Sequence, residues 1–192
     1  SEMCIRDRCC GTPWASKGMA EGHAVMGERV RASLLRATDG GRLPVVVDAS
    51  SCAHGVADLA ETAGIEVLDA VTYIAREALG ELEVSEKLPS VTLHPTCSSA
   101  HMGTVGDLRA VAEAAADQVQ IPVNWACCGY AGDRGMLHPE LTESATRAEA
   151  KTVAELDSRY HASSNRTCEL GMTQATGEPY AHVLELLERA TR

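Results

Sequence analysis

Short apolar runs alternate along this chain with longer stretches whose apolar positions recur every three or four residues. Residues 45–47 are three valines bounded by Pro44 and Asp48, which predicts a strand buried on both faces. Residues 19–37 before this run have helical spacing and end at a glycine pair. Further along, the pattern predicts a helix over residues 54–63, an extended segment over 65–68 and a helix that begins at Asp69.

The alternation restarts at Pro89, after a charged connector at residues 80–87 that we take as the boundary between two halves. Val91 and Leu93 predict a strand, and an apolar stripe over residues 105–119 is typical of a helix that lies on a sheet. Later strands are predicted at 121–125 and 159–162, and later helices at 139–157 and 180–187. Strands that alternate with helices indicate an α/β fold, with small parallel sheets flanked by helices.

The cysteines form an internal repeat. The triplet Cys-Cys-Gly occurs at residues 9–11 and again at 127–129, and each copy is followed by a Cys-x-x-Gly segment. Cys52 follows the first pair after 41 intervening residues, and Cys168 follows the second pair after 39. Neighbouring cysteines poorly suit a disulfide, whereas two adjacent thiolates suit a metal centre. The sequence therefore predicts two related halves, residues 9–88 and 89–192, that bind metal.

Most of these cysteines come just after a predicted strand, at the edge of a parallel sheet where ligands bind. The predicted metal ligands are Cys9, Cys10, Cys52, Cys97, Cys127, Cys128 and Cys168. The four in the second half suffice for a [4Fe-4S] cluster or for tetrahedral zinc. Their distribution over separate loops favours the cluster, because structural zinc sites usually use close pairs of ligands. We predict no catalytic residue from the sequence.

Other interpretations of the same residues stay open. Zinc is one, since His101 follows Cys97 at a Cys-x-x-x-His spacing. The adjacent cysteines at 127–128 can also form a redox disulfide or act as nucleophiles. The remaining histidines considered are expected in the core or in loops: His54, His94, His138 and His161.

Composition limits the classes of function. The chain has 192 residues and a formal net charge of −10, which argues against a nucleic-acid surface. Eight cysteines among regular helices and strands fit a reducing compartment better than a secreted disulfide scaffold. Residues 1–8 read like a translated sequencing adapter, so we expect them, with Cys4, to be an artefact and the natural chain to continue upstream.

The cysteine motifs, together with the segments at residues 9–19, 94–97 and 127–136, resemble the cysteine-rich CCG domain. The likeness covers about residues 9–192 and is most specific to the C-terminal part of FAD-linked D-lactate dehydrogenases of the cytochrome type. Related motifs occur in heterodisulfide reductase B subunits and in iron–sulfur subunits acting on glycolate or glycerol 3-phosphate. The chain departs from the CCG pattern at Gly55 and Gly171, where the pattern has a further cysteine.

The resemblance implies an iron–sulfur relay that takes electrons from a flavin after oxidation of a D-2-hydroxy acid. FAD and the hydroxy-acid site would lie upstream, so residues 9–192 alone are not expected to turn over substrate. The implied electron acceptor is a cytochrome or quinone chain, at a cytoplasmic location or at the inner face of the membrane. The opening cysteine of the first motif is expected about thirty residues before Cys9. A structural zinc or docking module is the rival interpretation.

Overall fold

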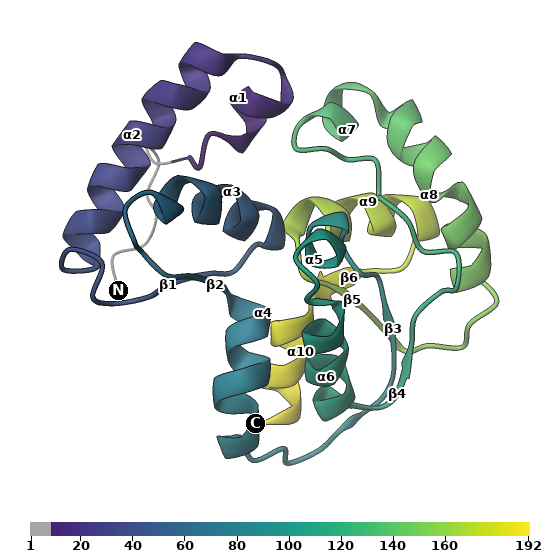
Figure 1. The fold of residues 1–192 in the computed structure, drawn as a ribbon. Helices are drawn as coiled ribbons and strands as arrows, with labels where there is room; N and C mark the ends of the chain where they lie inside the picture. Colours follow the sequence, from purple (N-terminus) through teal and green to yellow (C-terminus); the bar gives the residue numbers. More distant parts are fainter. Residues whose placement is uncertain (1–8) are drawn as a thin grey trace. The chain divides into compact units, whose positions relative to one another are not determined.

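The computed structural model describes residues 9–192, which adopt the α/β fold that the sequence predicts (Figure 1). The chain divides into two compact units that meet in sequence between Ala70 and Val71. The connector expected at residues 80–87 lies within the second unit, because the helical segment before it packs on the core of that unit. The assignment of two related motif regions stays a prediction. The proposed artefact at residues 1–8, with Cys4, lies outside the described residues.

The first unit contains a two-stranded parallel sheet, in which β1 (Val45–Val47) pairs with β2 (Val67–Asp69). Its helices are α1 (Thr12–Ser16), α2 (Ala20–Ala37) and α3 (Ser50–Glu61). The predicted strand and helices are confirmed, although α3 begins four residues before the expected start. The expectation that β1 is buried on both faces is wrong. A sheet of two strands covers little surface, and the central Val46 is exposed.

The second unit contains a four-stranded parallel sheet with the strand order β4-β3-β5-β6. The strands are β3 (Leu88–Leu93), β4 (Ala116–Gln120), β5 (Tyr160–Ser163) and β6 (Tyr180–His182). Its helices begin with α4 (Ala70–Tyr73), the π-helical η1 (Ile74–Ala78) and the 3₁₀-helical η2 (Leu79–Glu81). They continue with α5 (Cys97–His101), α6 (Val105–Ala115), α7 (Arg134–Leu137), α8 (Pro139–Val153), α9 (Arg166–Thr176) and α10 (Val183–Ala190).

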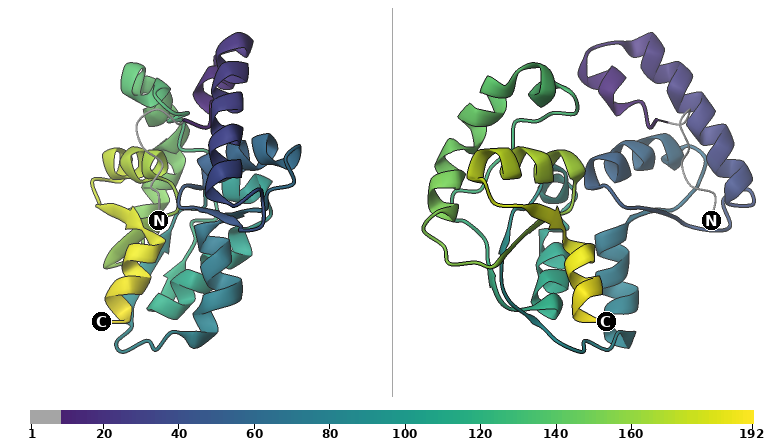
Figure 2. Two further views of the ribbon diagram at one scale, coloured as in Figure 1. Left: turned by 90° about the vertical axis from the view of Figure 1, so that its left-hand side faces the viewer. Right: turned by 180° about the vertical axis from the view of Figure 1, so that it is seen from behind.

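Strand β3 separates two different environments. Val91 and Leu93 point into the main apolar core, which α6 and α10 complete as they lie side by side (Figures 1 and 2). Because side chains alternate across a strand, Thr92 and His94 face the other side, where α8 and α9 pack together. These polar residues are fully buried. The second face of the sheet is therefore an enclosed polar environment, and the cysteines lie at its edge.

Several elements of the second unit differ from the prediction. The helix expected to reach residue 119 ends at Ala115, and residues 116–120 form β4 because they pair in register with β3. The strand predicted over residues 121–125 is wrong, and Val123 in that segment is 96% exposed. Tyr180 lies in β6 rather than in the closing helix. The segment between β4 and the Cys127-Cys128 pair is thus a loop.

The core on α6 provides a test of the fold. Leu108→Ala removes a side chain that is 1% exposed, and we expect a loss of about 2–5 kcal/mol in the free energy of unfolding because a cavity remains. Val123→Ala changes an exposed loop residue and should cost less than about 0.5 kcal/mol. Urea unfolding of both variants measures the difference. Equal effects of the two substitutions would contradict the assigned core.

Candidate metal site

Cys97 is placed by the segment that follows β3. Thr96 caps helix α5, since the Ser99 N–H donates to Thr96 Oγ1 at 2.9 Å and the Thr96 N–H donates to Ser99 Oγ at 3.0 Å. This reciprocal capping box fixes the first turn of the helix, of which Cys97 is the first residue. Cys97 itself is exposed. The carboxyl end of β3 therefore presents one thiol towards the surface of the unit.

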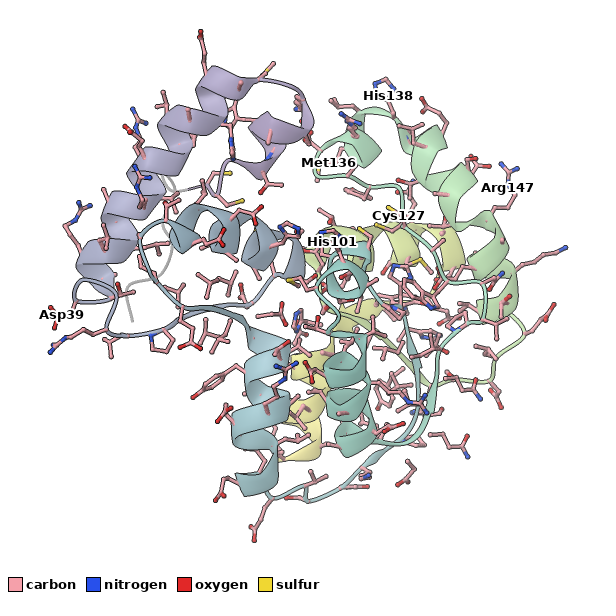
Figure 3. All side chains as sticks on the ribbon, viewed as in Figure 1. Asp39, His101, Cys127, Met136, His138 and Arg147 are labelled. Carbon is pink, nitrogen blue, oxygen red and sulfur yellow. The ribbon has the colours of Figure 1, made fainter. Side chains whose placement is uncertain are left out.

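The Cys127-Cys128 pair lies on the loop that leads from β4 to α7 (Figure 3). Gly129 follows the pair with φ +70°, and its N–H donates to Cys127 Sγ at 3.4 Å. A left-handed conformation turns the chain sharply and favours glycine. Cys127 is exposed, whereas Cys128 is buried. The two neighbouring thiols thus occupy an outer and an inner position.

Cys168 supplies the fourth thiol from the first turn of α9, and it is buried. Its backbone N–H donates to Asn165 O at 2.9 Å, and Asn165 Nδ2 lies 3.9 Å from Cys168 Sγ. Cys128 Sγ donates to Cys168 Sγ at 3.2 Å. Residues 40 positions apart in sequence are therefore in direct sulfur–sulfur contact.

The four thiols interact in a continuous series, in the order Cys97, Cys127, Cys128 and Cys168. Hydrogen bonds from Cys128 and Cys97 hold the pKa of Cys127 far below that of a free thiol. The hydrogen bond from Cys128 lowers the pKa of Cys168 to about 6, although burial opposes this. The hydrogen bond to Cys127 is the largest cause of the raised pKa of both Cys97 and Cys128. The four thiols therefore cannot all ionise together, because neighbouring negative charges repel one another.

His94 and Glu149 form a buried ion pair, and His94 interacts with Cys168, the last cysteine of this series. His94 Nδ1 lies 2.8 Å from Glu149 Oε1, and the two side chains are 0% and 2% exposed. Burial lowers the pKa of His94, but hydrogen bonding with Cys168 and Glu149 outweighs burial and raises this pKa to about 9. From the sequence, His94 is expected only as an ordinary core or loop histidine, and no motif includes Glu149. The sequence feature that could have identified His94 and Glu149 is a polar residue at a position of a strand or helix that faces the interior.

The first unit brings together its own three cysteines. Cys10 is buried and donates to Thr12 Oγ1 at 3.2 Å. The hydrogen bond with Cys52 lowers the pKa of Cys10 to about 5 and raises that of Cys52. Cys9 is exposed and adds a further hydrogen bond to Cys10. Each unit therefore brings its own cysteines into contact, and their role as metal ligands stays a prediction.

Both units fill the space beside the glycine of the Cys-x-x-Gly segment in the same way. A Cβ at Gly171 would lie 3.2 Å from the Tyr130 ring, and a Cβ at Gly55 would overlap the Thr12 hydroxyl. Tyr130 and Thr12 each stand two residues after the second cysteine of a pair. The positions where the CCG pattern has a further cysteine are thus occupied by a neighbouring side chain.

The four cysteine thiols suit a thiophilic metal, but the distances between their sulfur atoms are those of thiols without a metal. Among residues 9–192, no group of three or more His, Cys, Asp or Glu residues is arranged to hold one metal ion as it stands. Tetrahedral zinc with bonds of about 2.3 Å needs sulfur atoms roughly 3.7 Å apart, and a cluster needs a wider spacing. The contact at 3.2 Å must therefore open when metal binds. This contact joins the two buried cysteines, Cys128 and Cys168, so metal binding requires a shift inside the unit, whereas Cys97 and Cys127 are exposed.

Comparison with known protein families supports the prediction of a cysteine-rich domain in the second unit. Residues 91–173 match the family model of the cysteine-rich domain CCG, and this segment contains all four cysteines of the second unit. The resemblance to that domain is thereby confirmed for these residues, and such a domain is consistent with metal or iron–sulfur binding. No curated protein matches the chain. Within residues 9–192, every helix is too short or too polar to cross a bilayer.

Two glycines in the loop that carries Cys127 and Cys128 test how closely this loop packs against α8. Gly129 and Gly132 have φ values of +70° and +72°, so alanine at either position should cost about 1–2 kcal/mol of stability. A Cβ at Gly129 would also lie 2.9 Å from Leu141 O, whereas nothing lies within 4 Å of one at Gly132. We therefore expect Gly129→Ala to lose about 1–3 kcal/mol more than Gly132→Ala in denaturant unfolding. Similar losses would show that α8 does not confine this loop.

Proposed function

We propose that the chain is the iron–sulfur electron-transfer portion of a flavin-dependent D-2-hydroxy-acid dehydrogenase of the D-lactate type. The observation that carries the metal-binding part is the contact series of Cys97, Cys127, Cys128 and Cys168 at one edge of a parallel sheet. These four cysteines would hold a [4Fe-4S] cluster, which supplies one-electron chemistry when bound. The flavin part is supported by the sequence motifs that this chain shares with such dehydrogenases.

The arrangement of the four thiols suits electron transfer. Cys128 and Cys168 are buried beside the polar face of the sheet, whereas Cys97 and Cys127 are exposed. Burial on one side limits the access of water, and exposure on the other side leaves a short path to a redox partner. In the full-length protein, electrons would pass from a hydroxy-acid-reduced FAD through this region to a cytochrome or quinone acceptor. We place the protein in the cytoplasm or at the inner membrane face.

A structural zinc or docking module is the second candidate, and one observation favours it. The sulfur atoms of Cys128 and Cys168, 3.2 Å apart, are nearer to the spacing around a single tetrahedral ion than to that around a cluster. An iron–sulfur subunit acting on glycolate, glycerol 3-phosphate or a heterodisulfide is a further alternative. The upstream sequence distinguishes that alternative, because only the dehydrogenase has a fused flavin domain.

A series of single Cys→Ser substitutions tests the metal site. Anaerobic reconstitution with iron and sulfide should give broad absorbance near about 400 nm in the wild-type protein. Substitution of any of the four cysteines of the second unit should weaken metal binding by roughly tenfold or more, because the oxygen of serine replaces a soft sulfur ligand. Cys4→Ser is the control and should leave the metal content unchanged. Iron, sulfide and zinc analysis measures the outcome.

Equal metal content across the series would disprove the assigned ligands. A colourless protein that takes up zinc but no iron or sulfide would support the structural module instead. Retention of metal by the four variants of the second unit, with loss in variants of Cys9, Cys10 and Cys52, would assign the metal to the first unit alone.

The full-length protein tests the flavin context. A D-2-hydroxy acid should still reduce its FAD in the Cys128→Ser variant, because that reaction would occur upstream of the cluster. Transfer to an external acceptor should fall by roughly tenfold or more, since the route for electrons is broken. Stopped-flow flavin absorbance and steady-state acceptor reduction measure the two steps separately. Absence of flavin from the full-length protein would contradict the proposal.

A further inference from the structure

The ring of Tyr130 packs against the two buried cysteines of the second unit. Tyr130 is 7% exposed and forms one apolar cluster with Cys128 and Cys168, which are each 3% exposed. Leu170 is partly buried and packs against this cluster, which is separate from the main apolar core. Tyr130 is therefore the aromatic member of a cluster that otherwise consists of the two inner thiols and Leu170.

Two glycines make room for this ring. A Cβ at Gly135 would lie 2.7 Å from both Cγ and Cδ2 of Tyr130, and a Cβ at Gly171 would lie 3.2 Å from Cδ2. The Gly135 N–H also donates to the Tyr130 carbonyl at 2.8 Å. Gly135 belongs to α7 and Gly171 to α9, so the backbones of two helices approach the same ring atom. Glycine permits such a close approach because it has no side chain.

Helix α8 completes this packing through Thr142, which is 1% exposed. Thr142 Oγ1 lies 2.8 Å from the Cβ position of Gly135, and Thr142 Cγ2 lies 3.4 Å from that of Gly171. Cys128 Cβ lies 3.6 Å from the Cβ position of Gly171. Tyr130, Thr142 and Cys128 are therefore in close contact with α9. Because close packing leaves few gaps as large as a water molecule, this side of the site is closed to solvent.

The first unit has a smaller side chain at the corresponding position. Thr12 stands two residues after the second cysteine of its pair, as Tyr130 does in the second unit. Cys52, which corresponds to Cys168 in the repeat, is only partly buried. A threonine side chain has no ring that extends over neighbouring thiols. The two cysteine groups therefore differ both in the side chain beside them and in the exposure of their last cysteine.

We propose that Tyr130 closes the inner side of the second metal site to water and small molecules, whereas the cysteines of the first unit stay more accessible. The inference rests on the proposed function, because exclusion of water becomes important when the inner sulfur atoms are metal ligands. The apolar side chains around a metal site control the access of solvent to it. Tyr130 therefore slows the loss of metal without being a ligand.

Replacement of Tyr130 by the residue of the first unit tests this role in metal-free protein. Tyr130→Thr should increase the rate at which iodoacetamide alkylates Cys168 by roughly tenfold or more, since access to the thiol limits its reaction. Tyr130→Phe keeps the ring and should stay within about twofold of the wild-type rate. The rate for the exposed Cys97 should not change. Short pulses that modify a small fraction of each thiol, followed by peptide mass spectrometry, measure each rate.

Leu108→Ala is the control for a general loss of stability. It creates a cavity in the main core and leaves the cluster of Tyr130 intact. If Cys168 reacted only through unfolding of the whole unit, Leu108→Ala would accelerate its alkylation as much as Tyr130→Thr does. We expect a much smaller acceleration in Leu108→Ala than in Tyr130→Thr.

The wild-type protein provides a comparison that needs no variant. Each alkylation rate is divided by the rate for the same cysteine in denatured protein, which removes differences in intrinsic reactivity. Cys52 should then react roughly tenfold or more faster than Cys168, because only Cys168 is covered by an aromatic ring.

Reconstituted protein gives a readout of metal retention. The wild type, Tyr130→Phe and Tyr130→Thr should take up the same amount of iron, because the four thiols are unchanged. Tyr130→Thr should lose this iron to bathophenanthroline roughly tenfold or more faster than the other two, since the chelator and water reach the inner side of the site. The decay of the absorbance near about 400 nm measures this loss.

Several results would overturn the inference. They are an unchanged alkylation rate of Cys168 in Tyr130→Thr, an equal acceleration in Leu108→Ala, and equal normalised rates for Cys52 and Cys168 in the wild type. Equal rates of iron loss in Tyr130→Thr and Tyr130→Phe would overturn it while leaving the proposed function intact. Failure of the wild-type protein to bind either iron or zinc would refute the proposed function, and the role of Tyr130 in metal retention with it.

Discussion

The contact between Cys128 and Cys168, with sulfur atoms 3.2 Å apart, is the interaction on which the second unit depends. Four thiols that meet in one place cannot all ionise, because each new charge is repelled by the last. Without metal, protons must remain on some of the four sulfur atoms, and Cys168, whose pKa is lowered by its hydrogen bond with Cys128, interacts with the His94 imidazole. A metal cation removes the conflict by letting every sulfur become a thiolate. The parallel sheet serves to bring these sulfur atoms to a common edge.

The repeat of cysteines was enough to predict this meeting point. Cys97 follows β3 directly, and Cys168 follows β5 on α9, so strand ends in one parallel sheet account for their proximity. The expectation that the Cys127-Cys128 pair directly follows a strand is wrong. The strand expected immediately before the pair is a loop, and α8, through Glu149, contacts this loop at Ala126.

The sequence could not identify the residues that act through long-range contacts. His94 and Glu149 are 55 positions apart, and no local pattern indicates that a strand end and a helix interior will pair. The reason for glycine at position 171 was also not evident from the sequence, because the Tyr130 ring that fills the space beside Gly171 comes from the loop that carries Cys127 and Cys128. Solvent exposure was also hard to predict for Val46, since three consecutive valines are compatible with burial on one face or on two.

We propose above that the four cysteines of the second unit bind one inorganic centre. The most direct test is anomalous diffraction at the iron edge, from crystals of the reconstituted protein grown without oxygen. We expect a single compact peak in the second unit, bonded to the sulfur atoms of Cys97, Cys127, Cys128 and Cys168. Iron bound elsewhere in that unit, or a disulfide between Cys127 and Cys128 in place of a metal, would contradict it.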